Sequence, residues 1–218
     1  MAGFVTAKRS LGFKVETSAY TAETLATTDY NVSAYNINYD PDIAMKARDL
    51  ARAMYSRDAS IAGKHQITIS FSVDLCWGGT AATVPSYYKC LRACGMKQLA
   101  WTTVGVELVP DADYSNCPAT IEVVERDEGA SPSQLVIKAH GCMGNAKLII
   151  DNVGEPVRID FEFKGVLTSI TDRAFASQLV PTGFDTPAPD AMLGITTTIY
   201  SETMKFNKIT IDLGNDVQ

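Results

Sequence analysis

Apolar and polar residues alternate through residues 65–75, "HQITISFSVDL". The apolar positions of this stretch are Ile67, Ile69, Phe71, Val73 and Leu75. Because successive side chains of a strand point to opposite faces, this pattern predicts a strand with one face on a core and the other in water. The role of the polar face is then the first functional question.

Six further stretches are β-branched or alternating, and turn-forming Asp, Gly, Asn and Pro residues separate them. These predicted strands are residues 102–110, 119–127, 133–142, 146–151, 157–167 and 205–214. In the longest, apolar residues alternate with Arg158, Asp160, Glu162 and Lys164. The alternating charge signs favour weak cross-strand ion pairs on a wet face over a catalytic carboxylate pair.

One short helix is predicted over residues 85–94, because Pro85 suits a first helical turn and Gly95 suits the residue just past a helix end. Residues 1–64 have little periodicity. They are expected to form an N-terminal arm over 1–30 and a long loop over 35–64, and deletion of the first twenty residues is expected to leave the domain folded.

Residues 168–198 are predicted to be an extended loop, stiffened by Pro181, Pro187 and Pro189, and C-terminal strands follow over 199–218. The core then consists of strands within 65–167 and the one helix. The chain, 1–218, is therefore interpreted as one mainly β domain.

The chain has 218 residues, of which 46% are hydrophobic and 20% are charged, as in ordinary globular domains. No apolar run approaches the ~20 residues that cross a bilayer, and no signal peptide is recognisable, so no membrane partner is expected. The net charge of −6 disfavours a grip on nucleic acid but suits a wall that repels it. Five cysteines without a CxxC pair predict free thiols.

Catalytic and cofactor motifs are absent from the sequence. It contains no HExxH, no paired CxxC, no Asp-rich calcium loop and no phosphate-binding glycine motif, so no metal and no cofactor are expected. His140 and Cys142 lie two residues apart and can share a strand face, but a strand-end histidine beside a core thiol is favoured over a nucleophile pair. The sequence therefore predicts a protein that is not an enzyme.

Several segments, taken in order, resemble the tail tube proteins of long-tailed bacteriophages, especially those with flexible, non-contractile tails. Together these segments span nearly the whole chain. They are "SLGFKVETSAYTAET", "YDPDIAMKARDL", "SIAGKHQITISFSVDL", "PSYYKCLRACGM", "VRIDFEFKGVL" and "ITIDLGND".

The resemblance implies a β-sandwich of two roughly orthogonal antiparallel sheets with one short flanking α-helix. Subunits would close into rings whose inner strands form a continuous barrel, and the rings would stack into a virion tail assembled in the host cytoplasm. It also implies that the arm and the long loop contact the neighbouring ring, that tape measure, tail tip and tail terminator proteins are partners, and that DNA slides through an acidic lumen without specific binding.

Longer family members continue into a second, similar module, whereas this sequence ends at Gln218. A single-module subunit predicts six copies per ring, and a double-module subunit predicts three. The candidate inter-subunit residues are Leu11, Phe13, Tyr20, Asp42, Arg48, Asp49, Arg52 and Arg57. The candidate lumen residues are Asp74, Glu122, Asp160 and Glu162.

Two alternatives stay open at this point. The same fold can serve as a distal tail or baseplate-hub ring protein, present in few copies. A β-sandwich can also bind or hydrolyse carbohydrate at the host surface, which needs an aromatic platform or two converging carboxylates. Trp77, Trp101, Tyr87 and Tyr88 are the platform candidates, and the two tyrosines suit a helix core better.

Overall fold

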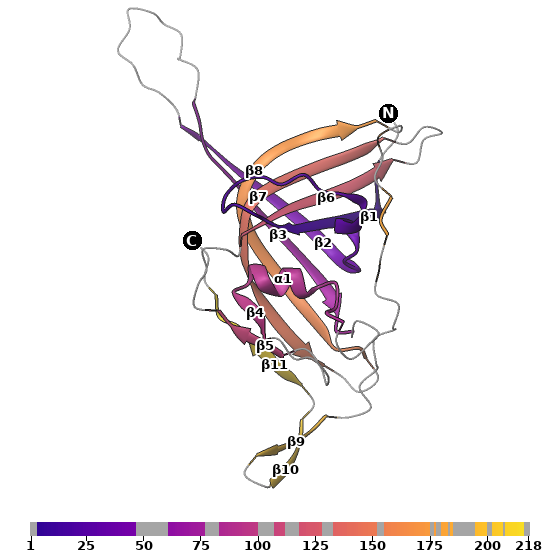
Figure 1. Cartoon of the computed structure of the whole chain (residues 1–218), viewed down its shortest axis with the longest axis vertical. Coiled ribbons are helices and arrows are strands. Elements are labelled where there is room, and N and C mark those ends of the chain that lie inside the picture. The colour runs from indigo at the N-terminus through magenta and orange to yellow at the C-terminus, as the bar shows by residue number, and fades with distance from the viewer. Residues whose placement is uncertain are drawn as a thin grey trace, which may run out of the picture.

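A computed structural model describes residues 4–46, 61–76, 83–99, 107–111, 118–127, 133–151, 155–174, 177, 180–182, 184, 195–199, 202–206 and 208–215. Over these residues the fold is mainly β, as the sequence predicts (Figure 1). The helices are α1 (Tyr88–Ala93) and the 3₁₀ turn η1 (Thr27–Tyr30). The strands are β1 (Phe4–Val15), β2 (Ala34–Lys46), β3 (Ile61–Asp74), β4 (Met96–Leu99), β5 (Glu107–Pro110), β6 (Ala119–Asp127), β7 (Gln134–Ile150), β8 (Arg158–Arg173), β9 (Ile195–Ile199), β10 (Glu202–Phe206) and β11 (Ile209–Asp212).

The principal sheet is antiparallel and has the order β1-β6-β7-β8-β3-β2, with β11 added beside the second part of β7. Its long strands β7 and β8 run through two halves. In the first half-sheet, β1 and β6 lie beside residues 134–142 of β7. In the second half-sheet the order is β11-β7-β8-β3-β2. Two small two-stranded sheets, β4–β5 and β9–β10, lie outside it.

The sheet bends where β7 and β8 carry bulges and glycines. The register between these strands shifts twice, between Lys138 and Ala139 and between His140 and Met143. A Cβ at Gly165 would overlap the sulfur of Cys142, so only glycine allows the two strands to approach this closely. Bulges twist and bend a strand, so the two halves fold toward one another.

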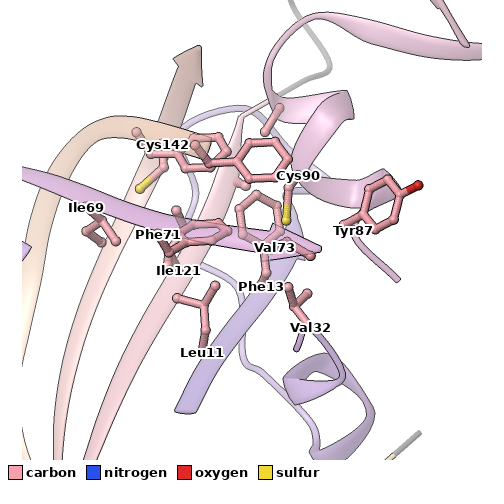
Figure 2. Packing of buried hydrophobic residues seen from close by; sticks show 14 of the residues in the cluster. Leu11, Phe13, Val32, Ile69, Phe71, Val73, Tyr87, Cys90, Ile121 and Cys142 are labelled. Carbon is pink, nitrogen blue, oxygen red and sulfur yellow. The ribbon is translucent and has the colours of Figure 1, made fainter. Parts of the chain in front are cut away.

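The core lies between the two half-sheets and is closed by α1. Phe13 of β1 packs on Phe163 of β8 with ring centroids 5.3 Å apart, and Phe71 of β3 lies 5.3 Å from Phe161. Figure 2 shows side chains of both half-sheets and the thiol of Cys90 converging in this core. Cys90, Cys94 and Cys142, buried cysteines in the described ranges, are free thiols, as predicted.

Arg9 connects the two edge strands of the principal sheet, β1 and β2, through its side chain. Its guanidinium lies 2.6 Å from Oε1 of Glu125 and donates to the carbonyl of Ile37 at 2.8 Å. Tyr39 donates to the same Glu125 oxygen at 3.2 Å, and its ring lies under the Arg9 guanidinium. The curled sheet is therefore held together at its edges by a polar contact as well as by the core.

The predicted N-terminal arm is wrong for residues 4–15, which form β1, an edge strand of the principal sheet. Leu11 and Phe13 are 1% and 0% exposed. Leu11, Phe13 and Val15 alternate with Ser10, Gly12 and Lys14, but this strand signal is short and glycine is a poor strand former. At Gly12 a glycine is required, since a Cβ would lie 2.6 Å from the side chains of Leu25 and Tyr30.

Residues 16–33, here called the strap, cross the outward side of β6. Leu25 and Tyr30 form a small second core with Val124 and Val136. Glu23 accepts a hydrogen bond from the backbone N–H of Thr17, and the Lys14 ammonium lies 3.0 Å from its carboxylate. The hydrogen bonds from Thr17 and then Lys14 lower the pKa of Glu23 to about 2. The strap leaves β6 buried on both faces.

The predicted long loop over 35–64 is wrong for residues 35–46 and 61–64, which belong to β2 and β3. These strands pair throughout as a hairpin, although Pro41 and the positive φ of Asn36 obscure its periodicity. Pairing of β3 with β8 ends at Gln66 and Val166. Residues 43–46 and 61–65 therefore project beyond the sheet as the hairpin arm (Figure 1).

The helix begins three residues later than predicted, after a turn that holds Pro85. The predicted strands 133–142 and 146–151 form the single strand β7, and the predicted strand 205–214 is divided between β10 and β11. The predicted loop over 168–198 is too long, because β8 continues to Arg173 and β9 begins at Ile195. Of the predicted strand 102–110, residues 107–110 form β5, and 101–106 lie outside the described residues.

Candidate functional site

The side of the second half-sheet that points away from the core is mostly polar. We call it the polar face. Strand register places directly opposed pairs such as Ser72 with Asp160 and Ser70 with Glu162 on the same face, and Lys147 lies opposite Asp160 on its other side. Its charged members are Asp40, Asp42, Asp74, Asp160, Glu162, Asp212, Lys147, Arg158 and Lys164. Six acids and three bases give this face a net charge of −3.

A shallow hollow of about 400 Å³ lies on the polar face, and Asp160, Glu162, Lys147 and Lys164 line it. Ser72 donates a hydrogen bond of 2.7 Å to Asp160, and the Nε of Arg158 lies 3.6 Å from the same carboxylate. These contacts hold charges of both signs in place on an open surface. They do not form an enclosed ligand pocket.

Asp212 of β11 is held by neighbours on β7. Asn145 donates to its Oδ1 at 2.6 Å, and Lys147 lies 3.1 Å from Oδ2. The hydrogen bond from Asn145, followed by those from the Gly214 backbone and Lys147, lowers the pKa of Asp212. This carboxylate therefore stays ionised at lower pH than a free aspartate does.

Tyr35 and Asp74 form a second contact at the margin of the polar face. The Tyr35 hydroxyl donates to Asp74 at 2.9 Å. Partial burial, and next the hydrogen bond to this carboxylate, raise the pKa of Tyr35 to about 12. The phenol is therefore neutral at physiological pH and acts as a donor.

Three of the four predicted lumen residues, Asp74, Asp160 and Glu162, share the polar face. The fourth prediction, Glu122, is wrong. Glu122 is 4% exposed because the strap covers it. The Tyr30 hydroxyl donates to it, and Lys138 and Arg173 lie 3.3 Å and 3.1 Å from its oxygens. It is a structural carboxylate.

The predicted inter-subunit residues are scattered. Leu11 and Phe13 are core residues, so their prediction as interface residues is wrong. Tyr20 is 66% exposed and lies beside Gly141, and Asp42 is exposed on β2. The remaining candidates, Arg48, Asp49, Arg52 and Arg57, lie outside the described residues.

Two strand edges border the polar face. Among the described strands, β11 pairs with β7 alone and β2 with β3 alone. Leu213 donates its N–H to Ala146 at 3.1 Å, so by antiparallel alternation the N–H groups of Thr210 and Asp212 point away from β7. Edges of this kind can accept a further strand.

Part of this site does not follow from the sequence pattern. The residues concerned are Asp40, Asp42, Lys147 and Asp212. The two aspartates lie in a segment predicted to be a loop, although "NYDPD" alternates acidic residues with others. That alternation was the available signal for a strand with an acidic face.

The described residues do not bring catalytic groups together. The His140 ring lies 2.7 Å from the Thr168 hydroxyl. Cys142 is fully buried, and the strand register shifts between His140 and Met143, so the two residues do not follow a regular alternation. Burial also raises the pKa of the Cys142 thiol. Within the described ranges, no three His, Cys, Asp or Glu side chains are placed to hold a metal ion. Among the same residues, no helix has the length and hydrophobicity to cross a bilayer.

The two tyrosines predicted as candidates for an aromatic carbohydrate platform do not form an exposed platform. Tyr87 is 5% exposed and donates to the carbonyl of Cys76, and the Tyr88 hydroxyl accepts the N–H of Gln98. Trp77 and Trp101 lie outside the described residues.

No known family model matches the sequence, and no curated protein is similar enough to count as a match.

Proposed function

We propose that this protein is the structural subunit of a bacteriophage tail tube. It oligomerises into stacked rings that form the channel for DNA ejection. The observation that carries the proposal is a net acidic polar face bordered by two strand edges, β2 and β11. The protein acts without a cofactor and performs no chemistry.

The two half-sheets, joined through the bent strands β7 and β8, suit the tail-tube sandwich of two roughly orthogonal sheets, because strands that pass from sheet to sheet at a bulge form such corners. In the ring, the β2 edge of one subunit pairs with the β11 edge of the next. A head-to-tail contact of this type closes when the rotation per subunit divides a full turn. We propose six subunits per ring, with a trimer as the alternative.

The polar face then lines the bore as part of a continuous barrel. Its net charge of −3 repels DNA phosphates, and its mixed charges leave no basic stripe to hold them. The hairpin arm extends toward the neighbouring ring. Tape measure, tail tip and tail terminator proteins are the further partners in the virion tail.

Proline at an outward-pointing N–H provides a sharp test of ring closure. We expect concentrated wild-type protein to form hollow rings or tubes in negative-stain electron micrographs. Thr210→Pro removes a donor at the β11 edge without removing a bond to β7, so it is expected to stay monomeric.

Thr210→Ala, which keeps the N–H, is the matched control and is expected to assemble. Circular dichroism and thermal unfolding of the monomer establish that the proline variant is folded. Wild-type protein that stays monomeric under every condition would contradict the proposed function. Normal assembly by the proline variant would contradict the β11 edge as the joint.

A further inference from the structure

An apolar groove lies at the surface between α1, β5 and β11. It has a volume of about 220 Å³, and its lining includes Leu75, Leu91, Leu108, Leu148, Ile211 and Leu213. Leu75 and Ile211 are 38% and 53% exposed. Tyr87 also lines the groove, and its hydroxyl donates to the carbonyl of Cys76. A groove of this composition binds apolar side chains rather than charged ones.

The hairpin arm carries exposed apolar side chains. Ile43 is 43% exposed and Met45 is 64% exposed. Among the described strands, residues 43–46 pair with residues 61–65 alone, since the pairing of β3 with β8 ends at Gln66 and Val166. Projecting apolar residues that their own sheet does not cover are typical of a contact with another molecule.

Charge favours a second copy of this chain as that molecule. The segment of the sequence from 46 to 64, which connects β2 to β3, holds five basic and two acidic residues, a net charge of +3. With −6 on the whole chain, the remainder carries −9. This basic segment is therefore attracted to the acidic remainder of another copy and steered toward it.

The two features lie toward opposite ends of the molecule. Figure 1 shows the hairpin arm extending from one end of the sheet, whereas α1, β5 and β11 lie toward the other. An arm that contacts a groove at the far end of an identical molecule makes a heterologous contact that repeats along an axis. Such a contact stacks copies, whereas the β2 and β11 edges join them sideways.

From these observations we infer that the apolar groove beneath α1 receives Ile43 and Met45 from the hairpin arm of a second copy. This inference rests on the proposed function, and it identifies the surface that joins one ring to the next. The flexible Met45 side chain can adapt its shape to an open groove.

Charge substitutions test this contact in the full chain. Ile211→Glu in the groove and Met45→Glu on the arm are both at exposed positions and are expected to leave the fold intact. Each is expected to give single rings that do not stack, as seen by negative-stain microscopy and sedimentation. Ile170→Glu, at a position 50% exposed on β8, is the matched control and is expected to form tubes.

A combined variant separates a direct contact from indirect damage. Met45→Lys together with Ile211→Glu places opposite charges at the contact and is expected to restore stacking that Ile211→Glu abolishes. Stacking by both single glutamate variants at wild-type length would overturn the inference. Loss of rings, as opposed to loss of stacking, in these variants would assign the groove to ring closure and would also overturn it.

Crosslinking tests the arm and groove even if no ring forms. A Met45→Cys chain is mixed with an Ile211→Cys chain and treated with a short bismaleimide. A covalent dimer absent from either chain alone is expected, and Ile170→Cys in place of Ile211→Cys is expected to give none. Equal coupling to both positions would overturn the inference and leave the proposed function to be judged by Thr210→Pro.

Discussion

Glu122 on β6 and Glu162 on β8 are both carboxylates on strand faces that point away from the core, but their surroundings differ. Glu122 is buried under the strap between the Tyr30 hydroxyl and two cations. Glu162 is exposed at the hollow of the polar face. A buried ion pair is costly to break because the partner charges stay behind without compensation.

Substitution of each glutamate by glutamine separates these two roles. Glu122→Gln leaves Lys138 and Arg173 facing a neutral group, so it is expected to lower the free energy of unfolding by about 3 kcal/mol. Glu162→Gln, the matched control, is expected to change it by no more than about 0.5 kcal/mol. Urea denaturation of both variants measures the difference, and equal effects would contradict the burial of Glu122.

At the scale of elements, β3 and the first part of β8 were predictable because apolar residues alternate without interruption over the core, and β6 because it is rich in β-branched residues. Strands β1 and β2 were not. In β1 the alternation of Leu11, Phe13 and Val15 is short and includes Gly12, a poor strand former, and Pro41 and the left-handed Asn36 interrupt the pattern in β2. Both strands owe their structure to tertiary pairing, which periodicity alone does not record.

The candidate site was predictable to the same extent as its strands. Asp74, Asp160 and Glu162 follow from the alternation in β3 and β8, since strand register then places them on one face. Asp40 and Asp42 could not be placed on this face, because β2 was not predicted as a strand. Glu122 was misassigned because the sequence pattern does not record that the strap folds back over β6.

Deletion of residues 1–20 contrasts β1 with the hairpin arm. From the sequence, the truncated protein is expected to fold. The structure leads to the opposite expectation, because Leu11 and Phe13 are core side chains whose loss costs about 2–5 kcal/mol each, out of a total stability of about 5–15 kcal/mol. Thermal unfolding followed by circular dichroism is expected to show no cooperative transition.

The hairpin arm supplies the control for that deletion. Asp42 and Gln66 face each other in the ladder, so an Asn-Gly turn between them can replace residues 43–65. This variant is expected to unfold cooperatively near the wild-type temperature, to form rings and to fail to stack. A folded protein after deletion of residues 1–20 would show that β1 is dispensable, contrary to its place in the core.

At the scale of the whole molecule, the proposed surfaces have different directions and different chemistry. The β2 and β11 edges offer backbone hydrogen bonds sideways, the hairpin arm and the apolar groove offer side-chain contacts along an axis, and the polar face offers neither. Assembly through the first two would leave the acidic polar face free inside. This division is what a conduit for a polyanion requires, since its wall must not bind the cargo.

Reversal of the charge on the polar face tests whether it lines a bore. Asp40→Lys, Asp42→Lys and Glu162→Lys together change the net charge of this face from −3 to +3. Tubes of this variant are expected to bind short linear duplex DNA, measured by fluorescence anisotropy, with an affinity that falls steeply as salt rises. Tubes with Asp40→Asn, Asp42→Asn and Glu162→Gln are the control for lost acidity without added bases.

Closed circular DNA cannot enter from a tube end, so binding of linear but not circular duplex places the new charges inside. Equal binding of both forms would place the polar face on the outer surface, and the bore would then need another lining.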